Sequence, residues 1–406
     1  MKRVLDLLVG EGFRVFFLFA GMSGFGVMLV WAAYQIGLMR AGIDLPVAMA
    51  PSEWHAHELI FGYGAATLGG FFLTAVPNWT GAKAAPHRYI ALVAGLWLVG
   101  RVAIWASLGV PMWIVAVVDL AFAPLLAAKI ATQLLRKPKP QNMIFLLFLA
   151  YFWGANLMVH LDWLGWGGDA ALGLRGGLMS LVGMIIVLGG RVTPAFTRNA
   201  MQRAAMISGV EPNMRNEPAA FTPVAIAFAA ALPPIAMLPV PDAVAGALYL
   251  AAGVFVLIRA LIWHTAFQWT QPILWTLHLS YAAIGAGLVL KGLVPFTGLT
   301  ELASLHFLAI GGVGGMTLSV MSRASLGHAG RALIAPRGVV LGYGLIPLAA
   351  VIRWLGGEMG GAVYDASIWL SIGLWLVAFG GFLIAFVPIY LTPRAPRAPV
   401  GAPPAE

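Results

Sequence analysis

Eight histidines carry most of the coordination chemistry that this sequence offers. The chain has no cysteine, which excludes disulfides, thiolate zinc sites, iron–sulfur clusters and covalent haem attachment through a CxxCH motif. Any metal must therefore use His, Met, carboxylate or backbone ligands. Among these ligands, neutral imidazole is the commonest one for haem iron and for copper. The histidines are His55, His57, His87, His160, His264, His278, His306 and His328.

The densest group of candidate ligands is the run WHAHE at 54–58, which contains His55, His57 and Glu58. In a helix, two residues advance by ~200°, so His55 and His57 would point to nearly opposite faces and serve different sites. In a loop, both histidines could bind one metal. The sequence is compatible with either conformation.

The elements that must position these residues are membrane-spanning helices. Of the 406 residues, 61% are hydrophobic and 10% are charged, and this charged share is far below the ~25% of a soluble domain. Many apolar stretches are long enough to cross ~30 Å of hydrocarbon, and we predict an all-α, polytopic transmembrane bundle of about twelve helices. The predicted spans lie near 13–39, 57–77, 89–108, 110–132, 142–162, 170–190, 221–239, 243–263, 271–291, 302–322, 335–355 and 366–391.

The distribution of basic residues predicts the orientation of this bundle. Lys and Arg are retained on the cytoplasmic side during insertion, and here they gather in alternate connections. The opposite side receives only Arg40, Lys291 and Arg353. We therefore expect both ends in the cytoplasm, with one transmembrane domain at 1–391 and a proline-rich, disordered tail at 392–406. The net charge of +9 is scattered between the spans and forms no stripe, which excludes a nucleic-acid-binding protein.

This topology sorts the histidines into two layers. At ~1.5 Å per residue, one group falls near the outer boundary and the other near the inner boundary, too far apart for one site. The run GGVGG at 311–315 follows His306 and would allow either close helix packing or a flat macrocycle. The outer layer comprises His55, His57, His160 and His306, and the inner layer comprises His87, His264, His278 and His328.

Charged residues inside the spans need partners, because a charge in hydrocarbon is costly. Arg101 and Asp119 fall at similar depths on adjacent antiparallel spans. Their placement predicts a structural ion pair, with a proton path as the less favoured interpretation. Arg175 lies near the outer end of the span 170–190, where it would balance a haem propionate or extend to the headgroups.

The order and spacing of four motifs resemble the NnrS family: WHAHE at 54–58, TAVPNWTG at 74–81, GRVTP at 190–194 and SRASLGHAGR at 322–331. The resemblance covers essentially the whole membrane part of the chain. It implies a multi-pass protein of the bacterial inner membrane that contains haem b and copper and acts in nitric-oxide metabolism and protection against nitrosative stress. An enzyme with redox activity on nitric oxide, a sensor and a metal- or haem-handling protein all fit this description. The resemblance defines neither a catalytic residue nor an electron donor. The family motif positions are His55, His57, Glu58, Asn78, Trp79, Arg191, His306, Arg323, His328 and Arg331.

The catalytic subunit of haem–copper oxidases and nitric-oxide reductases is similar in architecture, with twelve helices and haem ligands near the outer ends of the second and tenth. By this analogy, His57 and His306 are the expected axial ligands of haem b. The spans 170–190 and 221–239 carry no histidine, so an oxidase-type binuclear centre is not expected and the analogy concerns the fold alone. The copper candidates are His55, His160 and Glu58, the propionate candidates are Arg175 and Arg101, and a second, inner site would use His264, His278 and His328.

Two other functions fit the same topology. A secondary transporter also has about twelve helices interrupted by Gly and Pro. It would need a substrate site at the midplane, for which Arg101 and Asp119 are the only opposite charges. A membrane sensor or assembly protein would instead use its basic cytoplasmic loops, with Arg191 or Arg323 docking a partner.

Overall fold

The computed structural model describes residues 2–42, 44–209 and 214–396, and these ranges contain no strand. Eleven helices are long and apolar enough to cross a membrane, and a shorter apolar helix, Phe221–Met237, lies where the seventh of twelve spans is predicted. The prediction of a polytopic all-α bundle of about twelve helices is therefore confirmed.

The first half of the chain contains most of the outer histidines and their partners. Its helices are α1 (Lys2–Leu8), α2 (Gly12–Ala41), α3 (Pro51–His57), the π-helical segment η1 (Glu58–Gly64), α4 (Ala65–Thr80), α5 (His87–Trp105), α6 (Met112–Leu120), α7 (Phe122–Leu134), α8 (Pro140–Trp163) and α9 (Ala170–Ser208). The second half comprises α10 (Phe221–Met237), α11 (Asp242–Ile262), α12 (Ala266–Trp269), α13 (Pro272–Leu293), η2 (Val294–Phe296), α14 (Glu301–Phe307), the π-helical segment η3 (Leu308–Gly314), α15 (Gly315–His328), α16 (Arg337–Met359) and α17 (Gly361–Tyr390).

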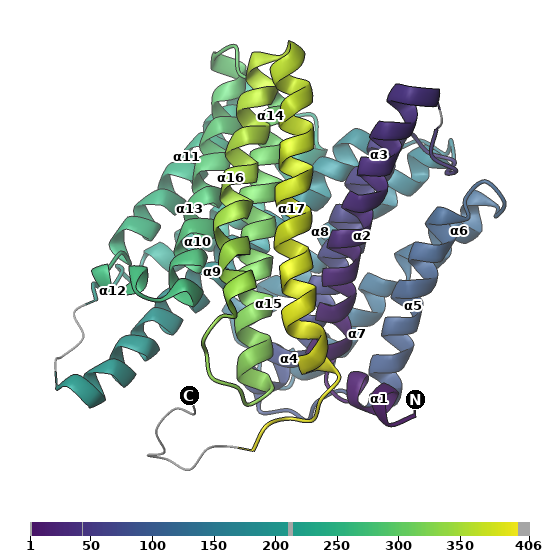
Figure 1. Ribbon diagram of the computed structural model, residues 1–406. Helices are drawn as coiled ribbons and strands as arrows, with labels where there is room; N and C mark the ends of the chain where they lie inside the picture. The colour runs from purple at the N-terminus through teal and green to yellow at the C-terminus, as the bar shows by residue number, and fades with distance from the viewer. Residues whose placement is uncertain (1, 43, 210–213, 397–406) are drawn as a thin grey trace.

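The beginning of α2 and the end of α17 lie at the same end of the bundle. The buried Arg14 of α2 donates hydrogen bonds to the carbonyl oxygens of Ile389, Tyr390 and Thr392, at 3.1, 3.2 and 2.8 Å. Figure 1 shows α1 and the last turns of α17 together at this end, with α3 and α14 at the other. This arrangement agrees with the predicted even number of crossings.

Two of the crossing helices share an unusual construction. In each of them, seven α-helical residues (α3 or α14) are followed by seven π-helical residues (η1 or η3) and then by a further α-helix. A π turn is wider than an α turn, and such turns occur frequently at functional sites. The two helices meet where the hydroxyl groups of Tyr63 in η1 and Thr317 in α15 form a hydrogen bond.

The glycine run at 311–315 serves close helix packing. A Cβ atom at Gly312 would lie 2.5 Å from Ile284 Cδ1, and one at Gly314 would lie 2.7 Å from the ring of Trp375. Neighbouring side chains therefore fill the space beside these glycines. Of the two interpretations of this run, helix packing is the one that the contacts support.

Two element boundaries differ from those predicted. The second spanning helix begins at Pro51 instead of residue 57, so the run 54–58 is helical. The helix α9 continues to Ser208 and has 39 residues, which corresponds to roughly 58 Å, about twice the hydrocarbon thickness. Hydropathy detects only the apolar part of such a helix, because its last turns are polar. The predicted tail at 392–406 lies outside the described residues from 397 onward and stays a prediction.

Close contact between α11 and α13 gives a test of this packing. A Cβ atom at Gly253 would lie 2.6 Å from the carbonyl oxygen of Gly285 and 2.7 Å from the backbone nitrogen of Val289. We expect Gly253→Ala to destabilise the protein by about 1–3 kcal/mol through overpacking, measured as a lower Tm in detergent. Gly344→Ala is the matched control, because no atom lies within 4 Å of its added Cβ. Equal Tm values for the two variants would contradict the packing.

Candidate functional site

Three buried side chains from three different helices form what we call the metal cluster: His57, Asp119 and His160. The Nε2 atoms of His57 and His160 lie 3.2 and 2.9 Å from Oδ2 of Asp119. All candidate ligand atoms lie within 4.8 Å of one another. Asn156 lies one helical turn before His160 on the same face of α8, and its amide oxygen lies 3.0 Å from Nε2 of His57.

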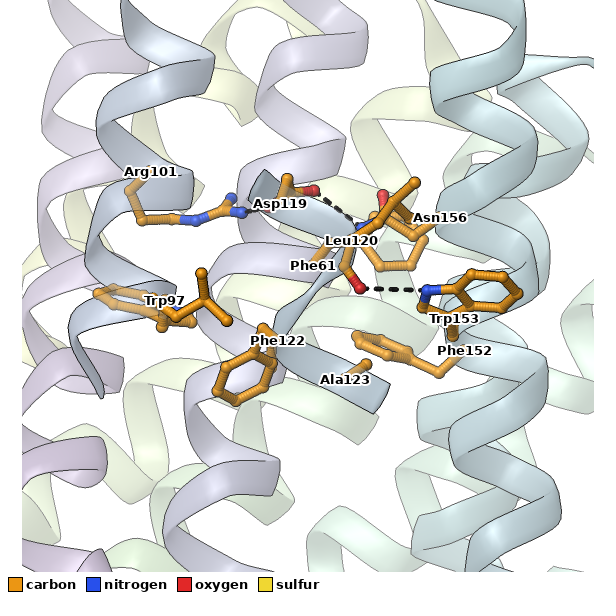
Figure 2. A pocket seen from close by; sticks show the side chains of 12 residues that line it. Phe61, Trp97, Arg101, Asp119, Leu120, Phe122, Ala123, Phe152, Trp153 and Asn156 are labelled. Atoms are coloured by element: carbon orange, nitrogen blue, oxygen red, sulfur yellow. Dashed lines mark hydrogen bonds and ion pairs between the residues drawn. The ribbon is translucent and has the colours of Figure 1, made fainter. Parts of the chain in front are cut away.

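The charges around this cluster do not balance. Arg101 of α5 forms ion pairs with Glu58 and Asp119, and Asn156 donates a 2.8 Å hydrogen bond to Asp119. Figure 2 shows Arg101 and Asn156 approaching Asp119 from opposite sides. The predicted ion pair between Arg101 and Asp119 is confirmed. Two carboxylates against one guanidinium leave a net negative charge beside two neutral imidazoles, and a buried charge of this kind favours a bound cation.

The spacing of the donor atoms fits a metal ion. Metal–ligand bonds of ~2.0–2.2 Å place neighbouring ligand atoms roughly 3–3.5 Å apart, and the distances from Asp119 to His57 and His160 fall close to this range. The Nδ1 atom of His160 is buried without a hydrogen-bond partner. The adjoining cavity, lined by Arg101, Asp119 and Asn156 among others, measures about 10 Å³. That volume is at the lower limit for one water molecule, so the site suits an ion better than a larger ligand.

A second group, the histidine–arginine cluster, consists of His55, His306 and Arg353. His55 stacks on Trp31, with ring centroids 4.4 Å apart, and it interacts electrostatically with both His306 and Arg353. The Nδ1 atom of His55 is buried and has no hydrogen-bond partner. His306 donates from Nδ1 to the carbonyl oxygen of Leu302 at 2.8 Å, so its Nε2 atom carries the free lone pair.

Arg353 is the arginine of this region that sequence reasoning missed. It is 7% exposed, and its guanidinium lies over the ring of Tyr364 at 4.7 Å while one nitrogen, Nη1, has no partner. Among the described residues, no carboxylate forms an ion pair with it, whereas Arg175 pairs with Glu301 at 3.0 Å. The signal in the sequence was a basic residue at the outer end of the apolar span 335–355, whose other basic residue, Arg337, lies at the opposite end.

The helical conformation of α3 decides which outer histidines lie together. It directs His57 toward His160 and His55 toward His306, so the loop alternative is wrong. The expected axial pair of His57 and His306 is divided between the two clusters. The copper candidates are divided in the same way. Glu58 contacts His57 at 3.3 Å and lies with His160 at the metal cluster, whereas His55 lies on the other face of α3.

The inner histidines do not gather into one site. His278 is hydrogen-bonded to the Thr197 hydroxyl at 2.9 Å and interacts electrostatically with His264, which accepts a 3.0 Å bond from Trp269. His328 instead lies against Phe13, at the base of the bundle. Within the described ranges, the metal cluster is the one group of three or more such ligands, so the inner set lacks a third ligand.

Most of the remaining motif positions contact a second segment of the bundle, while Asn78 bonds within its own helix α4. Asn78 donates to the Thr74 carbonyl oxygen at 2.9 Å, and the ring of Trp79 lies 5.6 Å from that of Phe145. Arg191 bonds to Asn142 and to the Gln141 carbonyl oxygen, Arg323 lies over the ring of Phe196, and Arg331 donates to the Thr392 hydroxyl. Arg191 and Arg323 are therefore partly buried against their own bundle.

The fold and the metal cluster together define a polytopic helical membrane protein with a buried His–Asp–His group that could hold a metal ion. A family model described as NnrS protein matches residues 7–394, so the chain belongs to the NnrS family. Membership makes it a membrane protein of the nitric-oxide response, in a family known for binding metal. A comparison with curated proteins gives no match.

The buried ion-pair network gives a stability prediction. We expect Arg101→Met to lower the free energy of unfolding by about 3–5 kcal/mol, because Glu58 and Asp119 would remain buried without a cation. Arg175→Met is the control, since its pair with Glu301 is about one-third exposed and should contribute less than about 1 kcal/mol. Denaturation of the two purified variants in detergent measures the difference. A loss at Arg101 no larger than that at Arg175 would rule out the network as a major support.

Proposed function

We propose that this protein is a haem b and copper protein of the bacterial inner membrane, acting in nitric-oxide metabolism or protection against nitrosative stress. The observation that carries the proposal is the metal cluster with its neighbours Glu58 and Arg101, where two carboxylates face one guanidinium and leave a net negative charge. Family membership supports the biological setting.

Copper is the proposed occupant of the metal cluster, with His57, His160 and Asp119 as ligands. Imidazole and carboxylate donors bind Cu²⁺ more strongly than the other divalent first-row metals. The contact of 3.3 Å between Nδ1 of His57 and Glu58 supports this role, because a carboxylate on the far nitrogen fixes the tautomer and aims Nε2 at the metal. Glu58 is then a positioning residue.

Haem b is proposed to bind beside the histidine–arginine cluster, where His55 and His306 would hold the iron. The free lone pair of His306 and the unpartnered nitrogen of His55 support this pair in place of His57 and His306. Arg353 is the proposed propionate partner, because Arg101 and Arg175 are already paired with carboxylates. Haem iron held by histidine can bind nitric oxide or pass electrons.

Secondary transport is the less favoured function. Arg101 and Asp119, the two opposite charges that would have built a midplane substrate site, bind each other, and Arg101 also binds Glu58. A sensor or assembly role is compatible with the same cofactors, and it would require a partner surface that neither cluster supplies.

Metal analysis tests the copper site. We expect His57→Ala and His160→Ala each to lose most of the bound copper, measured as the copper-to-protein ratio of purified protein, because each removes one of three ligands. His264→Ala is the control, since His264 is exposed and its recorded bond is with Trp269. An unchanged ratio in both cluster variants, or an equal loss in the control, would disprove the assignment.

Absorption spectroscopy tests the haem site. Protein expressed with adequate haem should show a Soret band, and His55→Ala and His306→Ala should each remove or shift it because an axial ligand is lost. His57→Ala should keep the band, since His57 faces the metal cluster. Loss of the band in His57→Ala but not in His55→Ala would restore the axial pair expected from the sequence. A wild-type protein without a Soret band would refute haem binding altogether.

A further inference from the structure

A cavity of about 270 Å³, which we call the Arg191 pocket, opens between the helices α4, α8 and α9. It lies near the end of α4 and the start of α8, at the end of the bundle opposite α3 and α14. Neither the metal cluster nor the histidine–arginine cluster contributes a residue to this pocket. The residues that line it are Trp79, Lys139, Gln141, Asn142, Leu188, Arg191 and Val192.

The charge of this pocket is positive. Arg191 and Lys139 supply two cations, and the lining includes no carboxylate. The guanidinium of Arg191 donates to the side-chain oxygen of Asn142 and the backbone carbonyl of Gln141, and it lies over the ring of Phe145 at 5.4 Å. These neutral partners fix its orientation and leave its charge unbalanced. A partly buried cation of this kind attracts an anion.

The start of α8 adds to this positive potential. The helix begins at Pro140 with Lys139 as its N-cap residue, and no side chain caps this end. Pro140 has no N–H, and the N–H of Asn142 donates to the Lys139 carbonyl oxygen at 2.7 Å, so Gln141 carries the remaining N–H of the first three positions. Gln141 and Asn142 of that turn line the pocket. The N-terminus of a long helix favours negative charge, because the positive end of the helix dipole lies there.

Size and position narrow the choice of anion. A volume of about 270 Å³ is below the ~300–1,000 Å³ of most small-molecule sites and suits a headgroup. Trp79 lies at the helix end, where indole rings mark the headgroup level of a bilayer. Basic pockets between transmembrane helices on the cytoplasmic side recognise anionic headgroups.

We propose that the Arg191 pocket binds the phosphate group of an anionic phospholipid headgroup. Arg191 contacts the phosphate oxygens through its planar fork, Lys139 contributes a second cation at the rim, and Trp79 packs against the glycerol. Trp79 and Arg191 are two motif positions for which the cofactor sites provide no role. The lipid ties α4, α8 and α9 together at the cytoplasmic face.

The test measures the Tm of the full-length, delipidated protein with added phosphatidylglycerol, phosphatidylcholine or inorganic phosphate. We expect phosphatidylglycerol alone to raise the Tm in a saturable way. Arg191→Gln and Lys139→Gln should each weaken its apparent affinity by about tenfold, because each removes a charge-assisted bond. Lys129→Gln is the matched control, since Lys129 of α7 lies over the ring of Tyr89 in α5 and does not line the pocket.

Three results would overturn the proposal. One is an equal response to phosphatidylglycerol and phosphatidylcholine, which would mean that the headgroup charge is not recognised. Another is an equal response to inorganic phosphate, which would identify a free anion as the ligand. The third is a wild-type response in both pocket variants. Lys139 is exposed, so its variant should fold and keep the test decisive even if Arg191→Gln is unstable.

Discussion

The outer half of this protein depends on one buried guanidinium. Arg101 binds Glu58 of η1 and Asp119 of α6, and Asp119 in turn binds Asn156 and His160 of α8. Charged groups inside a membrane must remain paired, so the helices that carry them cannot slide or rotate independently. The same ionic contacts therefore fix the relative positions of all three proposed copper ligands. Stability and ligand geometry have a common origin in this network.

Hydropathy and the placement of basic residues were enough to predict the helical bundle and the pairing of Arg101 with Asp119. The bundle and the ion pair both depend on how deep each residue lies in the membrane, and counting residues from the end of a helix gives that depth directly. The grouping of the histidines depends on rotation about a helix axis and on which helices are neighbours. His55 and His57 are equally deep, and only the conformation of α3 shows that they serve different clusters. Arg353 was overlooked for a similar reason, because its missing partner is a property of three-dimensional packing.

The two clusters also differ in what they connect. The metal cluster draws its ligands from α3, α6 and α8, all in the first half of the chain. The histidine–arginine cluster takes His55 from α3 and its other two residues from α14 and α16 of the second half. One short helix therefore faces both, so a displacement of α3 caused by binding at one cluster would be transmitted to the other. The proposed copper and haem sites would be coupled through a single turn of backbone.

The π-helical segment η1 sets the rotation of α3, which carries His55 and His57, relative to α4. Each residue of an α-helix advances the chain by ~100° about the helix axis. The π-helical segment has wider turns, so it rotates the side chains of α3 relative to those of α4. After the segment the chain returns to α-helix at α4, where the Thr67 hydroxyl donates to the carbonyl oxygen of Tyr63 at 3.0 Å. A one-residue insertion or deletion within η1 would thus redirect both histidines while leaving α4 in place. The number of residues in this segment therefore sets the direction of both histidines independently of the rest of the fold.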